Sequence, residues 1–205
     1  MTRAPLGTKA PEATRRKLLE AAFAEFYANG FQAGSLNDIV AAAGATKGAL
    51  FHHFASKQDL GYAVLDEIIG PLLLHRWLDP LADSSDPLTD IQRTFRRYVV
   101  EDCQSGNWQL GCPLNNLAQE MSPLDEGFHA RIDRLYGLWR ERYTAALAGG
   151  QQAGAVSRRV PPADAAAIIV AAQMGIWGSG KGSHSQTAMR QATEGLCAYL
   201  DALRP

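Results

Sequence analysis

Apolar residues recur every three or four positions along most of this chain, which is the spacing of amphipathic helices, and no stretch shows the alternation of a strand. The clearest pattern begins at Ser35, a good N-cap, with Asp38 three residues on to complete a capping-box pattern. Gly44 follows the last apolar position, where a left-handed C-cap costs glycine nothing. The pattern predicts a helix over 36–43 with an inward stripe of Leu36, Ile39, Val40 and Ala43.

A second short helix is predicted over 46–54, with Thr46 as its cap and Ala49, Leu50 and Phe54 facing inwards. At ~1.5 Å per residue it would be roughly 13 Å long, and a major groove about 12 Å wide accepts such an element. Its outward positions combine donors, a small gap and aromatic surface: Thr46, Lys47, Gly48, Phe51 and His52. Two helices crossed about a glycine turn predict a helix-turn-helix that binds double-stranded DNA.

The chemistry of the second helix suits a duplex. Lys47 can pair with phosphate or guanine, and Phe51 offers apolar contact to a thymine methyl. Gly48 and Ala49 keep the start of the helix thin, so that its backbone can approach DNA. We therefore expect this helix to read the major groove.

Ser56 is placed to cap a third helix, with Lys57 in its first turn. A cation beside free backbone N–H groups suits a phosphate, so we interpret Lys57 as a clamp on the DNA backbone. The net charge of −1 hides an asymmetry, because the first 60 residues carry seven Lys and Arg against five Asp and Glu, and the remainder 13 against 16. This modest positive excess supports a DNA-binding N-terminal region without being able to predict it.

The run LNDIVAAAGATKGALFHHFASKQDL, residues 36–60, resembles the signature of the TetR family of bacterial transcriptional regulators, including the spacing of Gly44, Gly48 and Phe54. The resemblance implies DNA contacts by Thr46, Lys47, Gly48, Ala49, Phe51 and His52. With Ser35 and Lys57, these residues form the expected DNA-binding set. Phe51 departs from the family, where tyrosine is common and its hydroxyl usually reaches phosphate.

The remaining periodicity predicts an all-α protein with a three-helix DNA-binding head on a larger helical bundle. We expect a tail and DNA-binding domain over 1–56 and an effector-binding and dimerisation domain over 57–205. The helix after Lys57 should run to about Gly70 and kink or break at Pro71. Further breaks are expected at 83–87 and 105–107. A long helix should end at Gly149 and Gly150, and Pro161-Pro162 should open the next.

The last two helices form the expected homodimer surface, over about 163–177 and 187–203. The segment 163–176 is apolar nearly all round and rich in alanine, which suits burial on several sides. The second helix carries a stripe of Met189, Ala192, Leu196, Tyr199 or Leu200, and Leu203. Two such pairs would form a four-helix interface, and a two-fold dimer predicts an inverted-repeat operator. A purely intramolecular core is the alternative.

A cavity for a small, mostly apolar effector is expected among residues that combine apolar walls with a few polar groups: Trp108, Cys112, Asn116, Gln119, Tyr136, Trp139, Tyr143 and Trp177. Family resemblance implies that binding there alters the spacing of the recognition helices and releases DNA. Repression is the family default.

Cys112 stands between Gly111 and Pro113, where a helix N-terminus would favour its thiolate. The Gly-Cys-Pro-Leu segment resembles a TetR subgroup in which some members respond to unsaturated or electrophilic molecules. A repressor that senses electrophiles or oxidants through Cys112 is therefore an alternative to reversible ligand binding, as is an ordinary buried cysteine. Three cysteines argue against a disulfide framework, and Cys103 and Cys197 sit at helical packing positions.

The composition favours a cytoplasmic protein without membrane span, metal or other cofactor. No apolar region of a signal peptide occurs in the first ten residues, and the longest apolar run is too short for a bilayer. Adjacent His52 and His53 point about 100 degrees apart on a helix and have no carboxylate or cysteine cluster beside them. We expect His52 to point outwards and His53 to pack inwards.

Two other classes of protein remain. An enzyme on a helical bundle is suggested by GIWGSGK, residues 175–181, which matches part of a phosphate loop, but Gly182 stands at the Ser or Thr position and a helix precedes it. We expect a loop between the dimer helices there. Cys112 with His129 lacks an orienting partner for nucleophilic catalysis. A helix-turn-helix used only for protein contacts is the third possibility.

Overall fold

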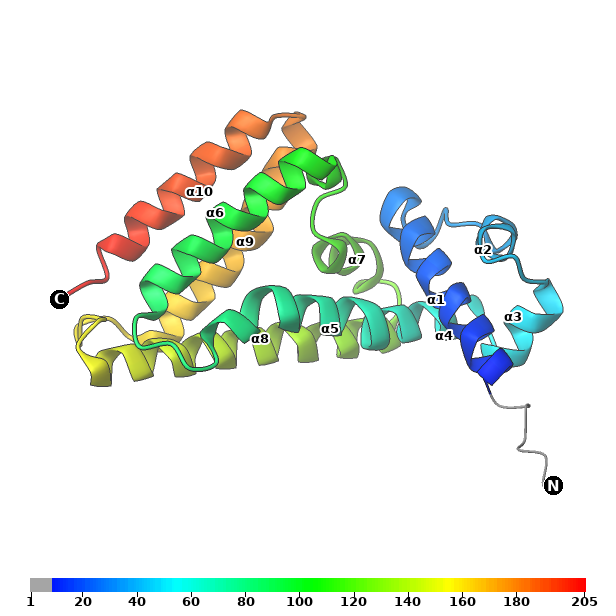
Figure 1. The fold of residues 1–205 in the computed structure, drawn as a ribbon, viewed down its shortest axis with the longest axis horizontal. Coiled ribbons are helices and arrows are strands. Elements are labelled where there is room, and N and C mark those ends of the chain that lie inside the picture. Colours follow the sequence, from blue (N-terminus) through cyan, green and yellow to red (C-terminus); the bar gives the residue numbers. More distant parts are fainter. Residues whose placement is uncertain (1–8) are drawn as a thin grey trace, which may run out of the picture. The chain divides into compact units, whose positions relative to one another are not determined.

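The structure is a computed structural model that describes residues 9–205, and the expected N-terminal tail before residue 9 lies outside this range. Every regular element in the described range is helical, which confirms the all-α prediction (Figure 1). None of these helices has the length and apolarity needed to cross a membrane. The chain forms two compact units, which we call the head (residues 9–70 and Leu117–Arg131) and the body (residues 71–116 and 132–205).

The head begins with four helices: α1 (Lys9–Asn29), α2 (Leu36–Ala42), α3 (Lys47–His53) and α4 (Lys57–Val64). Their buried apolar residues form one small core: Leu18, Leu19, Ala22, Phe26, Phe31, Ile39, Leu50, Phe54 and Leu60. α1 packs against α2, α3 and α4, and α2 packs against α3. The helix-turn-helix is therefore held from behind by α1.

The predicted N-caps of α2, α3 and α4 are confirmed. Thr46 Oγ1 accepts from the N–H of Ala49 at 3.1 Å, and Ser35 and Ser56 cap their helices in the same way. One detail of the prediction is wrong, because Asp38 does not complete a capping box. The N–H of Ser35 instead donates to Oε1 of Glu25 on α1, at 3.0 Å. A packed neighbouring helix thus supplies the acceptor that sequence spacing assigned to α2.

The head also contains a segment from the second half of the chain, formed by the end of α7 (Pro113–Met121) and the start of α8 (Glu126–Ala153). The ring of Phe128 packs edge-on against Phe31, with centroids 4.7 Å apart. Gly61 makes this approach possible, because a Cβ there would lie 2.6 Å from both rings. Tyr62 adds a hydrogen bond to Asp125 at 2.6 Å, so long-range contacts fasten α4 to this segment. The functional division into residues 1–56 and 57–205 stays a prediction.

The helical turns after α4 continue through η1 (Leu65–Ile69), α5 (Gly70–Leu73), η2 (Leu74–Leu78) and η3 (Asp79–Leu81), where η1 and η2 are π-helical. Of the two outcomes predicted at Pro71, the break is wrong, and the kink stays a prediction. Proline removes a donor and crowds the preceding turn of an α-helix, whereas the wider turn of η1 closes with a bond from Gly70 N–H to Leu65 O. The π turn accommodates Pro71 without ending the helix.

In the body, α6 (Pro87–Ser105), η4 (Asn107–Gln109), α9 (Pro162–Ser183) and α10 (Gln186–Asp201) enclose an aromatic core. α10 lies along both α6 and α9 (Figure 1). The predicted break after Ser105 is confirmed by Gly106, whose φ of 84° is left-handed. Pro162 opens α9 as predicted. In this core the ring of Trp77 packs against those of Phe95, Tyr98, Trp139 and Trp177.

Two predicted helix ends in the body are wrong. α8 continues past Gly149 and Gly150 to Ala153, and ends before Gly154, whose φ is +80°. Gly150 serves close packing, since a Cβ there would lie 2.6 Å from Val156 and 2.7 Å from Pro87. Residues 175–181, expected to form a loop, belong to α9. A continuous helix through this segment has no free backbone N–H groups to cradle a phosphate.

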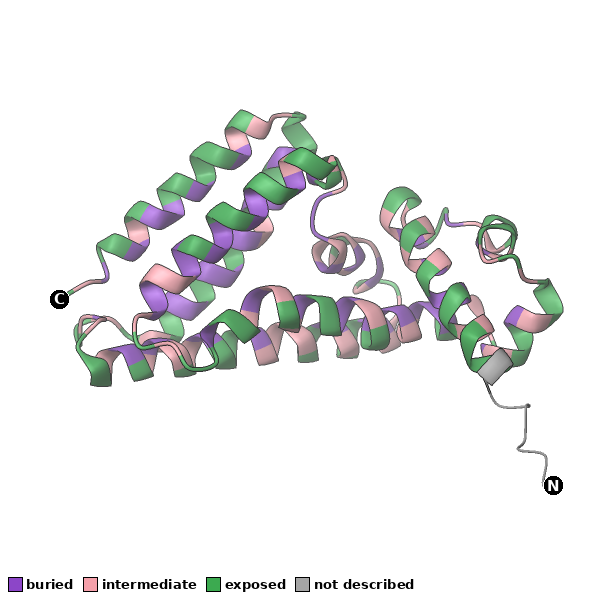
Figure 2. Ribbon diagram, in the orientation of Figure 1, coloured by how far each residue is buried: buried purple, intermediate pink, exposed green. Residues whose placement is uncertain are grey.

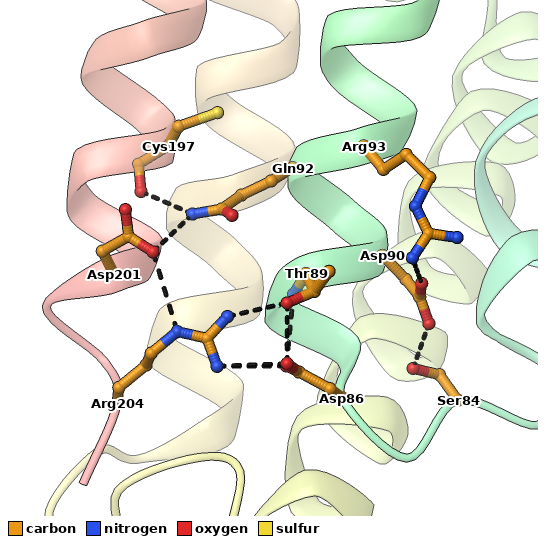
Figure 3. A network of polar contacts seen from close by, with 9 residues as sticks. All are labelled: Ser84, Asp86, Thr89, Asp90, Gln92, Arg93, Cys197, Asp201 and Arg204. Carbon is orange, nitrogen blue, oxygen red and sulfur yellow. Dashed lines mark hydrogen bonds and ion pairs between the residues drawn. The ribbon is translucent and has the colours of Figure 1, made fainter.

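Polar contacts fasten the end of α10 to the start of α6 (Figure 3). Gln92 donates to the carbonyl oxygen of Cys197 at 2.9 Å and to Asp201 at 2.8 Å. Arg204 forms an ion pair with Asp86 at 3.1 Å and donates to Thr89 at 2.8 Å. Burial opposes ionisation of Asp86, but hydrogen bonds from Thr89 and Arg204 together lower its pKa. These contacts hold the C-terminal end of α10 to α6 within the protomer.

Candidate functional site

The outward face of α3 is accessible. Thr46, Lys47, Gly48 and His52 are exposed, and Phe51 keeps 50% of its surface in solvent. The ring of Phe51 is therefore accessible to a partner, whereas the neighbouring Leu50 is buried in the core of the head. Gly48 lies in open space, where the nearest atom to an added Cβ would be Thr46 Oγ1 at 3.8 Å. A partner backbone can therefore approach the start of α3 closely.

The remaining predicted DNA-binding residues lie around this face. Ala49 and Ser35 are half-buried, and both take part in capping bonds. Lys57 is half-buried, with Nζ 3.0 Å from the carbonyl oxygen of Gln32 and 5.1 Å from the ring centroid of Phe31. An ammonium has three N–H donors, so one bond to Gln32 leaves donors for a phosphate. DNA contact by each of these residues stays a prediction.

His52 and His53 lie side by side, with ring centroids 5.2 Å apart. His52 is exposed and His53 half-buried. Within the described residues, no group of three or more His, Cys, Asp or Glu is placed to hold a metal ion.

The eight residues proposed for effector binding differ in how far they are buried. Five are buried in the body: Trp108, Cys112, Trp139, Tyr143 and Trp177. Tyr136 and Asn116 are half-buried, with the Tyr136 hydroxyl 3.5 Å from the sulfur of Met174 and the Asn116 amide donating to Leu110 O at 2.7 Å. Gln119 is exposed and belongs to the head. Figure 2 shows buried positions recurring along α6, α9 and α10. Trp139 and Trp177 both pack against the ring of Trp77, whereas Gln119 is exposed.

A charged group inside the aromatic core was not recognised from the sequence. Arg76 Nη2 donates to Oδ2 of Asp102 at 2.5 Å, and its guanidinium lies 4.0 Å from the ring centroid of Tyr98. Trp177 Nε1 donates to the same carboxylate oxygen at 2.6 Å. Asp102 continues the inward stripe of α6 after Phe95 and Tyr98, so a charged residue at an apolar position was the available signal.

Three buried polar atoms near these rings have no hydrogen-bond partner: Arg76 Nε, Trp139 Nε1 and Gln173 Oε1. Trp139 and Gln173 are 2% and 1% exposed. A buried polar group without a partner costs about 1–3 kcal/mol, and such groups in native proteins call for a water, ion or ligand.

Cys112 immediately precedes α7, as expected, but it is 5% exposed. Burial raises the pKa of its thiol, which outweighs the backbone N–H groups of Asn115 and Leu114 that favour the thiolate. The neutral thiol is therefore the resting form at neutral pH.

A separate cavity of about 410 Å³ lies in the body between η2, η3 and the last third of α8. Leu74, Leu78 and Ala145 give it apolar walls, and Asp79 and Arg142 add charge. None of the eight predicted effector residues lines it.

Comparison with known proteins agrees with this architecture. Residues 18–64 match "Bacterial regulatory proteins, tetR family", and residues 88–196 match "Tetracyclin repressor-like, C-terminal domain". Among similar proteins, the HTH-type transcriptional repressor DhaR of Mycobacterium sp. (strain GP1) is 28% identical over 162 residues, covering 78% of this chain and 79% of DhaR. Transcriptional regulator AcuR of Cereibacter sphaeroides is 28% identical over 156 residues, 75% of this chain and 69% of AcuR.

A solved structure of a TetR transcriptional regulator from Chloroflexus aurantiacus has the same fold, with a TM-score of 0.81 and 24% identity over 95% of this chain and 97% of that one. Since the C-terminal match spans more than half of the 205 residues and the N-terminal match covers the helix-turn-helix, this chain belongs to the TetR family of DNA-binding transcriptional regulators, which are not enzymes.

Proposed function

We propose that this regulator is a repressor that binds an inverted-repeat operator as a homodimer and is released by a small molecule. The observation that carries the proposal is the outward face of α3, where Lys47, Phe51 and His52 are exposed on a capped helix of groove-fitting size. Residues 1–56 form the proposed DNA-binding domain, and residues 57–205 form the proposed effector-binding and dimerisation domain. A protein acting on bacterial DNA works in the cytoplasm.

The exposed surfaces of α9 and α10 support the homodimer. α9 exposes small residues and Ile168, which is 51% exposed. The stripe predicted on α10 is corrected by the structure, because Met189, Leu196 and Leu200 are buried within the protomer. The outward face of α10 carries small residues instead: Ala192, Gly195 and Ala198. Small residues on both helices suit close approach of a second copy, over 163–177 and 187–203.

The unpartnered buried polar atoms support an effector that carries hydrogen-bonding groups. Trp139 Nε1 and Arg76 Nε offer donors and Gln173 Oε1 an acceptor, among aromatic rings that would cover an apolar portion. We therefore favour a largely apolar molecule with at least one hydrogen-bonding group. The alternative, electrophile or oxidant sensing by Cys112, is less supported because the thiol is buried and its pKa is raised.

Binding to duplex DNA from the region flanking the protein's own gene tests the proposal, against a scrambled duplex across a salt series. We expect sequence-selective binding that salt weakens and that Lys47→Ala with His52→Ala abolishes. Equal binding to both duplexes, followed by failure to select any sequence from a random pool, would contradict operator recognition and favour a helix-turn-helix used for protein contacts.

A further inference from the structure

We infer that Glu120 is a positioning residue for DNA binding, which holds the Phe31–Gln32 backbone and, through the carbonyl of Gln32, the ammonium of Lys57. The inference rests on the proposed function in one respect, that Lys57 contacts a DNA phosphate. It gives a role in DNA binding to a residue about 60 positions beyond the helix-turn-helix in the sequence.

The connection between α1 and α2 leaves two successive amides to be satisfied from outside. α1 ends at Asn29, and Gly30 turns the chain with a left-handed φ of +85°. The N–H of Phe31 then donates to Oε2 of Glu120 at 2.9 Å, and the N–H of Gln32 donates to Oε1 at 2.7 Å. Consecutive backbone N–H groups form a concavity that binds an anion, and here a side-chain carboxylate is that anion.

Gly30 is required by this arrangement twice. Its φ disfavours any residue with a Cβ, and a Cβ at this position would lie 3.1 Å from Oε2 of Glu120. Both carboxylate oxygens are engaged, and hydrogen bonds to an ionised acceptor are stronger than neutral ones. The loop is therefore fixed in position by α7.

Gln32 also holds Lys57, through its carbonyl group on the next peptide unit. Gln32 donates its N–H to Glu120 and accepts from Lys57 Nζ through its carbonyl oxygen at 3.0 Å. The ammonium also lies 5.1 Å from the ring centroid of Phe31, a cation–π distance. These contacts fix the charge at the start of α4, where backbone N–H groups also favour a phosphate. Without Glu120, the carbonyl that orients Lys57 would lose its own anchor.

The test measures affinity for a duplex that the wild-type protein selects from a random-sequence pool, by fluorescence anisotropy across a salt series. We expect Glu120→Ala to raise Kd about tenfold at constant salt, and to lower the slope of log Kd against log salt by about one for each phosphate clamp lost. Lys57→Ala should do the same. The double variant should be no weaker than Lys57→Ala alone, because the two residues act in series.

Glu126→Gln is the matched control, since it removes one negative charge from an exposed position in the same segment. It should leave both Kd and the salt slope unchanged. Additive effects of Glu120→Ala and Lys57→Ala, or a salt slope that stays at the wild-type value, would overturn the inference while leaving operator binding intact.

Hydrogen exchange gives a second readout that does not depend on DNA. In Glu120→Gln, which keeps the side-chain size, the amides of Phe31 and Gln32 should exchange at least about tenfold faster at an unchanged melting temperature. Unchanged exchange at both amides would contradict the positioning role. A wild-type protein that selects no duplex would overturn the proposed function, and the role of Glu120 in DNA binding with it.

Discussion

Trp177 on α9 donates its indole N–H to Oδ2 of Asp102 on α6 at 2.6 Å, and the same oxygen accepts from Arg76 on η2. One carboxylate therefore joins three segments of the body core. Asp102 is 5% exposed, and the side chain of Arg76 is 20% exposed, with its guanidinium over the ring of Tyr98. Asp102 is what allows a cation to lie within an aromatic core.

Asp102→Asn should lower the free energy of unfolding of the body by about 2–4 kcal/mol, because it leaves the partly buried charge of Arg76 without its counterion. Asp133→Asn is the control, since Asp133 is exposed on α8 and has no hydrogen-bond or ion-pair partner among the described residues. Urea unfolding measures both. Equal stability of the two variants would show that the ion pair adds no net free energy to the fold.

Phe51→Tyr should tighten operator binding by about three- to tenfold, because it adds a hydroxyl at a position where relatives commonly place a phosphate donor. Phe51 is half-exposed at the outward face of α3, so the added group meets no buried neighbour. Anisotropy titrations against the selected duplex measure the change, with Phe51→Leu as the variant that gains no donor. If both variants bind as wild type does, Phe51 does not face the DNA backbone.

Local spacing explains which parts of the head could be predicted. Ser35, Thr46 and Ser56 each cap a helix by accepting from the third residue after them, so the whole interaction lies within four residues of sequence. Two other hydrogen bonds could not be predicted: Ser35 N–H donates to the carboxylate of Glu25, and Gln32 N–H donates to that of Glu120. These bonds span 10 and 88 residues of sequence and depend on how the helices pack.

Glycine and proline marked helix ends correctly at Gly106 and Pro162, but not at Gly150 and Pro71. Gly150 and Pro71 suggested helix ends, yet Gly150 admits Val156 and Pro87 at close range, and Pro71 follows a π turn. The sequence correctly indicates an apolar stripe on α10, but the stripe is covered by other helices of the same protomer and not by a second copy. Periodicity identifies a buried face without saying which surface covers it. In the proposed effector site, residue type alone indicates the aromatic side chains, whereas the pairing of Arg76 with Asp102 crosses 26 residues and depends on helix packing.

Ala171→Glu should break the proposed homodimer. Ala171 is exposed on the outward face of α9, so a carboxylate there is tolerated in a monomer but would meet its own copy in a two-fold interface. Burying unpaired like charges should weaken association by about 100-fold or more. Analytical ultracentrifugation measures the dissociation constant, with Ala130→Glu as a control at an exposed position of α8 in the head. A dimer that persists unchanged would place the interface elsewhere.

Cys112 should react with iodoacetamide at pH 7.4 at least about tenfold more slowly than a free cysteine, because each unit by which a thiol pKa rises removes about nine-tenths of its thiolate. The half-exposed Cys103 should be modified first.

Burial raises the folded-state pKa of Cys112 above its ordinary value of 9.0. The stability gained from keeping the thiol neutral is therefore fully present below about pH 9 and is lost as pH rises through the folded-state value.

Mass spectrometry of the alkylated protein decides whether Cys112 is a buried packing group or a covalent sensor whose modification releases DNA. If the thiol is a buried packing group, electrophiles at neutral pH leave it unmodified, and any release of operator DNA they cause is identical in Cys112→Ser. Stoichiometric modification of Cys112 at the rate of Cys103, with DNA release lost in Cys112→Ser, would instead establish covalent sensing. That outcome would require the start of α7 to open transiently, because the folded thiol is only 5% exposed.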